Sequence, residues 1–224
     1  SYNTYFKVEG KNVTVNMNGM TISGAYTDSG KMLVGVFSTD NAGHLTVTGN
    51  GTVNVTATAK VYSLFANYEP GCSITIEDGT YTLDKAHDSL LYSGCNTAEN
   101  EGITVNGGNF TLGNVGTGTN GKPWIINCLG GNDNATVVNG GTFNSDISHQ
   151  FWANEVSIPA DLALKNNGDG TWTLGEAVAC AEEKASSSGS TVRKVGYATL
   201  QEAIDAVANG KTVTLLKDIE LGAA

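Results

Sequence analysis

The stretch ITVNGGNFTL, residues 103–112, decides how this chain folds. It joins two short segments of alternating apolar and polar residues through a turn of asparagine and glycine, and similar stretches recur along the chain. A fixed period of about 20–50 residues is the signature of a solenoid or repeat array. The sequence therefore predicts stacked repeats, each with two strands and a tight turn. The marker glycines recur about every 30 residues, at Gly19, Gly51, Gly79, Gly108, Gly141 and Gly170.

Alignment on these glycines predicts columns of equivalent residues, because successive coils of a parallel β-helix stack about 4.8 Å apart. We expect a parallel β-helix of about six coils. One column holds threonines between apolar neighbours, which should point outward: Thr14, Thr46, Thr75, Thr104 and Thr136. A second column is aromatic and is either a ladder in the core or a sugar-stacking platform; core packing is the favoured interpretation, since stacked rings fill space. Its members are Tyr81, Phe110, Phe143 and Trp172.

The composition bounds the class of partner. The 224-residue chain is 40% hydrophobic and only 15% charged, with a net charge of −10 and Arg193 as its single arginine. Such a chain is apolar enough to fold, and it lacks the basic face that nucleic acids, anionic membranes and polyanionic glycans require. No apolar run approaches the length needed to span a bilayer. The low charge, the abundance of Thr and Asn and the repeats favour an extracellular, secreted or cell-surface protein.

Two of the four cysteines share one position in the repeat. Cys95 and Cys128 each lie thirteen residues before a marker glycine, in the column that also contains Ser38 and Ala66. Stacking at about 4.8 Å lies within the Cα range of a disulfide. The pair is therefore either a disulfide or two buried thiols, and the thiols are favoured because parallel side chains in a ladder do not automatically reach the required dihedral angle.

The character of the chain changes after residue 178. Residues 179–194 are polar and serine-rich, which predicts a linker between a β-helix at 1–178 and a separate segment at 195–224. Residues 197–210 predict a helix, with Thr199 and Glu202 as a capping box, and residues 211–221 predict a return to β structure. The apolar residues expected to cap or assemble are Tyr197, Leu200, Ile204, Val207, Val213 and Leu215.

Four stretches carry a family resemblance. Residues 197–221 (YATLQEAIDAVANGKTVTLLKDIEL), 11–24 (KNVTVNMNGMTISG), 140–148 (GGTFNSDIS) and 166–174 (NNGDGTWTL) resemble repeat modules of large cell-surface proteins of Gram-positive gut bacteria. Those modules are similar to right-handed parallel β-helices of the pectate-lyase-like superfamily. The resemblance implies that the helix and its following strand precede the first coil, whereas in this chain they lie at the opposite end.

The position of the helix and strand at the C-terminal end suggests how the module is used. An open β-helix end exposes unpaired backbone and apolar core, and the segment at 195–221 either caps the first coil of another copy or folds back on its own chain. The first alternative predicts head-to-tail filaments. We expect a non-catalytic structural or adhesive module of a bacterial surface protein or fibre, with other copies, and in addition a glycan or host surface, as partners.

The competing interpretation is a carbohydrate-active or glycan-binding domain. Lyases and hydrolases on the fold that the resemblance implies use clustered acids, and Asp78, Asp84 and Asp88 lie close in sequence without recurring between coils. The histidines share no metal-ligand spacing. We therefore predict no catalytic residues, no metal and no cofactor.

Overall fold

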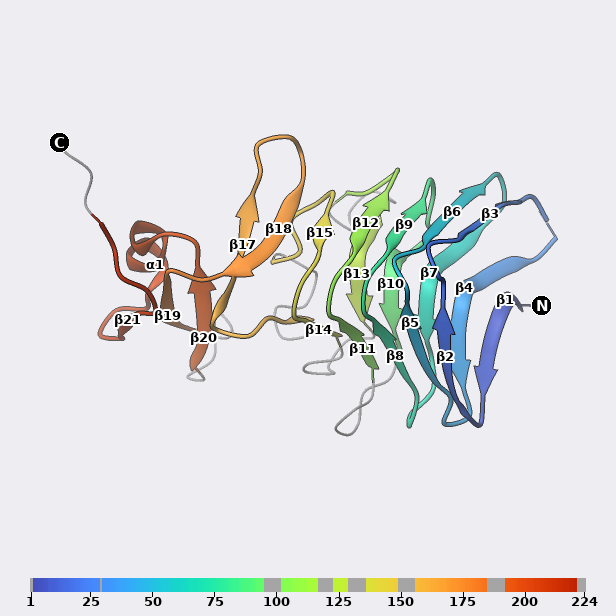
Figure 1. The fold of residues 1–224 in the computed structure, drawn as a ribbon, viewed down its shortest axis with the longest axis horizontal. Coiled ribbons are helices and arrows are strands. Elements are labelled where there is room, and N and C mark those ends of the chain that lie inside the picture. Colours follow the sequence, from blue (N-terminus) through green and yellow to red (C-terminus); the bar gives the residue numbers. More distant parts are fainter. Residues whose placement is uncertain are drawn as a thin grey trace.

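The computed structural model describes residues 2–28, 30–94, 102–116, 123–128, 136–148, 156–184 and 192–220. These residues form an all-β solenoid, most of whose strands pair in parallel, followed by one short helix and a final strand (Figure 1). The predicted fold class is confirmed.

Three sheets run along the solenoid. Sheet A contains β1 (Tyr2–Glu9), β4 (Met32–Asp40), β7 (Val61–Asn67), β10 (Ser89–Ser93) and β13 (Trp124–Cys128). Sheet B contains β2 (Asn12–Asn16), β5 (His44–Thr48), β8 (Ser73–Ile76), β11 (Gly102–Val105), β14 (Thr136–Val138) and β16 (Val156–Ser157). Sheet C contains β3 (Thr21–Tyr26), β6 (Thr52–Ala57), β9 (Thr80–Leu83), β12 (Asn109–Leu112), β15 (Thr142–Phe143), β18 (Trp172–Glu176) and β17 (Leu162–Asn166).

The chain passes through sheets A, B and C in turn, and it makes about four turns between β1 and β13. The prediction of six coils is wrong at the C-terminal end. Strand β18, which carries the last marker sequence, pairs antiparallel with both β15 and β17. The turn after Asn167 is therefore a hairpin, closed by the bond from Asn167 N to Thr171 O (2.9 Å), and not the corner of a coil.

The register of sheet B confirms most of the threonine column. Thr14, Thr46, Thr75 and Thr104 occupy equivalent positions, and their apolar neighbours are buried in the later coils. Thr136 was misplaced: it pairs with Ile103 and is fully buried, while Val137 lies beside Thr104. The glycine turn sets this register, because Val137 precedes Gly141 by the same interval that separates Thr104 from Gly108.

Three predicted members of the aromatic column stack inside the solenoid. Tyr81, Phe110 and Phe143 share one register position in sheet C and are almost completely buried. The ring centroids of Tyr81 and Phe110 are 5.3 Å apart, and those of Phe110 and Phe143 are 5.1 Å apart. Trp172 lies opposite Phe143 across the antiparallel pair and is half-buried. The column is therefore core over three coils.

A C-terminal unit follows the hairpin of β17 and β18. Its sheet D has the order β20 (Val192–Tyr197), β19 (Ala179–Lys184), β21 (Val213–Leu215), and helix α1 (Leu200–Ala206) packs on it. The prediction of a linker is wrong for residues 179–184 and 192–194, which form an antiparallel strand pair; the serine-rich residues 185–191 lie outside the described residues. Ala179 and Ala181 lie on one face of β19, and their small side chains let this face pack under the helix.

The capping box starts the helix as predicted. Glu202 N donates to Thr199 Oγ1 (3.2 Å), and Thr199 N donates to Glu202 Oε2 (2.9 Å). The helix ends at Ala206, earlier than the predicted Gly210. The reason is that Ala208 N leaves the helical pattern and donates to Glu182 O on β19 (3.0 Å).

Candidate functional site

The predicted capping residues divide into two groups. Tyr197, Leu200, Val207 and Val213 pack with Ala203 against Ala179 and Ala181, within this same chain. Ile204 and Leu215 do not join that cluster and are 49% and 53% exposed. The segment therefore folds on its own β19, and only part of its apolar surface is left for another partner.

The C-terminal unit is joined closely to the end of the solenoid. Leu216 N donates to Val178 O (2.9 Å), and Lys217 forms an ion pair with Glu176. At Gly196, a side chain would overlap the backbone carbonyl oxygens of Leu162 and Ala160, the latter at 2.8 Å. A glycine is thus required where β20 crosses the start of β17.

Gly196→Ala is expected to loosen this junction, at a cost of about 1–3 kcal/mol, because the added methyl must displace backbone and not a flexible side chain. Hydrogen exchange should report faster exchange of the amides of sheet D, with the coils unaffected. Gly175→Ala is the matched control, since nothing lies within 4 Å of an added Cβ there. Equal exchange in the two variants would contradict the predicted overlap.

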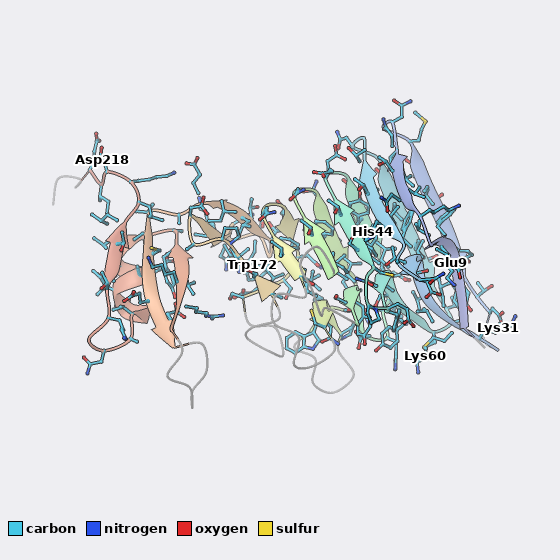
Figure 2. The ribbon with its side chains drawn as sticks, turned by 90° about the horizontal axis from the view of Figure 1, so that it is seen from below. Glu9, Lys31, His44, Lys60, Trp172 and Asp218 are labelled. Atoms are coloured by element: carbon cyan, nitrogen blue, oxygen red, sulfur yellow. The ribbon has the colours of Figure 1, made fainter. Side chains whose placement is uncertain are left out.

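The two ends of the molecule hold its large exposed apolar side chains. Among the described residues these are Tyr5, Phe6 and Met20 on the first coil, and Ile204, Leu215, Leu216 and Ile219 on the C-terminal unit. The two groups lie at opposite ends of the long axis (Figure 1), as Glu9 and Asp218 mark in Figure 2.

The first coil is the terminal coil of the part of the solenoid that the structure describes. Strands β1, β2 and β3 are the terminal strands of sheets A, B and C, so within the described residues each pairs along one edge. Phe6 extends the internal stack of Phe37 and Phe65, with ring centroids 5.1 Å apart at each step. Because Phe6 remains 46% exposed, this stack ends at the surface.

The predicted cysteine column is wrong in its register. Ser38 does pair with Ala66, but that position continues to Tyr92 and Asn127. Cys128 pairs instead with Ser93 and is buried, its Sγ 3.5 Å from Thr136 Oγ1. The count from the glycine fails because the connections between sheets A and B differ in length. Cys95 lies outside the described residues, so the state of the pair stays a prediction.

Two of the acids that the sequence singled out have structural roles. Asp78 accepts a hydrogen bond from Asn50 N (2.8 Å), and Asp84 accepts one from Ala57 N (2.7 Å), each reaching the preceding coil. His44 Nδ1 lies 2.8 Å from Ser73 Oγ in the next coil. Within the described ranges, no group of three His, Cys, Asp or Glu side chains has the arrangement of a metal site.

Asp88 belongs to a surface cluster that the sequence did not predict. Three tyrosines pack with one another on the outer side of sheet A: Tyr62, Tyr68 and Tyr92. In the strands, the side chains of Tyr62 and Tyr92 lie on the opposite face from those of Phe65 and Leu91, which point into the core. Ring centroids are 5.1 Å apart for Tyr62 and Tyr92, and 4.8 Å apart for Tyr68 and Tyr92. We call Tyr62, Tyr68, Tyr92, Asp88 and the adjacent His87 the tyrosine cluster.

Neutral donors hold the Asp88 carboxylate. Asn127 Nδ2 donates to both of its oxygens at 3.0 Å, and Ser89 Oγ donates to Oδ2 at 3.0 Å. Burial, followed by the nearby Asp88 charge, raises the pKa of Tyr62 well above its usual range. Burial, with a smaller effect of Lys60, lowers the pKa of His87. The side chain of Tyr62 is therefore neutral at pH 7, and His87 is mostly so.

Fold and geometry define the class: the chain is a β-solenoid protein with a helix-and-strand unit after its coils. No family model, curated protein or solved structure matches the chain. No helix in the described part of the chain has the length and apolar character needed to cross a membrane.

Proposed function

We propose that this chain is a non-catalytic structural and adhesive module that assembles head to tail through its C-terminal unit, in a fibre or surface protein of a bacterium. The observation that carries the proposal is the location of the exposed large apolar side chains, which in the described residues lie on the first coil and on the C-terminal unit. Monomeric proteins rarely leave such groups exposed together without a partner.

The strand edges support the same arrangement. Within the described residues, the first coil offers the unpaired edges of β1, β2 and β3, and β21 is the terminal strand of sheet D. Backbone groups on such edges gain hydrogen bonds when a strand from another chain is added. A contact between two different surfaces of one chain is heterologous, and unless the rotation closes a ring it produces an open filament.

Leu215→Lys and Met20→Lys test the two surfaces separately. We expect the wild-type chain to grow in mass with concentration in light scattering, and each variant to remain a monomer, because each places a charge where apolar surface must be buried. Both side chains are largely exposed, at 53% and 63%, so folding should not be affected. Thr111→Lys is the matched control: Thr111 is exposed on β12, in the middle of the solenoid, so this variant should assemble normally.

Mixing the two variants gives the sharper result. Leu215→Lys retains a functional first coil and Met20→Lys retains a functional C-terminal unit, so the mixture should form one-to-one dimers and stop there. A wild-type chain that stays monomeric at all concentrations would contradict the proposal. So would variants that fail to complement each other while remaining folded.

A further inference from the structure

The tyrosine cluster lies outside the apolar core of the solenoid. The core of the solenoid lies on the other side of sheet A, where Phe37 and Phe65 stack. The tyrosines instead lie on the outer side, where Tyr62 and Tyr68 remain partly accessible and His87 is exposed. Lys60, which directly precedes β7, marks this side of the coils in Figure 2.

The rings present apolar surface at different angles. Tyr62 meets Tyr92 edge-to-face at 88°, whereas Tyr68 is tilted by 39° from Tyr92. His87 adds a fourth ring, 5.9 Å from Tyr62. Tyr92 is buried and fixes the partly accessible rings of Tyr62 and Tyr68. Rings fixed by their neighbours contact a ligand without a large loss of side-chain entropy.

The polar part of the cluster is the Asp88 carboxylate, a hydrogen-bond acceptor that no described cationic side chain pairs with. Within the described residues, Asp88 forms no ion pair, and its side-chain hydrogen-bond partners are the neutral Asn127 and Ser89. A carboxylate accepts strong hydrogen bonds from hydroxyl groups. The cluster thus places a fixed acceptor beside aromatic faces, over two successive coils whose strands lie roughly 5 Å apart.

We propose that the tyrosine cluster binds a short stretch of a neutral saccharide. The apolar C–H faces of the sugar rings pack on Tyr62 and Tyr68, and a sugar hydroxyl donates to Asp88. A few polar groups within an aromatic surface are the usual composition of a small-ligand site. The net charge of −10 and the Asp88 carboxylate disfavour anionic sugars such as uronates. This site does not depend on head-to-tail assembly.

The test is an array of neutral and uronic-acid oligosaccharides, followed by calorimetric titration of the best neutral hexasaccharide into the wild-type chain and its variants. Tyr62→Ala should weaken binding about tenfold or more because a ring face against the sugar is lost, and Asp88→Asn should do the same because a hydrogen bond to a charged group is lost. Glu69→Gln is the control: it removes an exposed charge next to Tyr68 and should leave binding unchanged.

Three results would overturn the proposal: no retention of any neutral sugar, equal binding of uronic-acid oligosaccharides, or binding that survives both substitutions. If Tyr62→Ala does not fold, Asp88→Asn alone decides, because it keeps the shape of the side chain, removes its charge and replaces one acceptor oxygen with an NH2 donor. Leu215→Lys supplies a monomeric background in which the same titration is independent of assembly.

Discussion

Phe110→Ala is expected to lower the free energy of unfolding by about 3–5 kcal/mol, the usual cost of removing a buried aromatic ring. Phe110 lies between Tyr81 and Phe143, with interplanar angles of 22° and 12°, and only 1% of it is exposed. Its neighbours belong to the coils on either side. The substitution therefore leaves a cavity that spans the contact between coils, and β-strands on both sides limit how far it can collapse.

Equilibrium unfolding in urea, followed by far-ultraviolet circular dichroism, measures this loss. Trp172→Ala is an informative comparison, because Trp172 is the fourth member of the predicted column but lies half-buried on the antiparallel hairpin. It should cost clearly less than Phe110→Ala. Equal losses, or a loss below about 1 kcal/mol for Phe110→Ala, would show that the stacked rings do not hold the coils together.

The aromatic ladder was predictable because each of its members follows a glycine turn by a fixed number of residues. The strands of sheets B and C lie directly before and after that turn. Residues at equal distances from successive glycines are therefore paired in these sheets, as Thr75 and Thr104 are. The prediction failed where a connection varies in length. Cys128 lies beside Ser93 in the structure, because a register in sheet A cannot be counted across the connection to sheet B.

The tyrosine cluster had a weaker signal. Tyr62, Tyr68 and Tyr92 are visible in the sequence, but Tyr68 follows β7 at a position where the neighbouring coils have Asp40 and Gly94. The contact of Asp88 with Asn127 joins residues in different coils. Such neighbours are defined by stacking and not by period. The C-terminal unit shows the same limit, because only its three-dimensional packing shows that Ala179 and Ala181 support α1.

Gly108→Ala is expected to cost about 2–4 kcal/mol, through two effects that the glycine turns combine. Gly108 has φ of 109°, a conformation that strains a residue with a side chain. In addition, its Cβ would lie 2.9 Å from the carbonyl oxygen of Gly79 in the preceding coil. Gly79 and Gly141 have similar φ values and the same close approach, so the turns stack through a space that excludes side chains.

Gly168→Ala separates the two effects. Gly168 also has a positive φ, of 80°, but nothing lies within 4 Å of an added Cβ there, so only the backbone strain of about 1–2 kcal/mol should remain. Urea unfolding of the two variants should therefore differ by about 1–2 kcal/mol, the contribution of the steric overlap between coils. If both variants lose the same stability, backbone strain alone accounts for these glycines. In that case the period of the sequence would be maintained by the conformation of each turn, and not by the contact between one turn and the next.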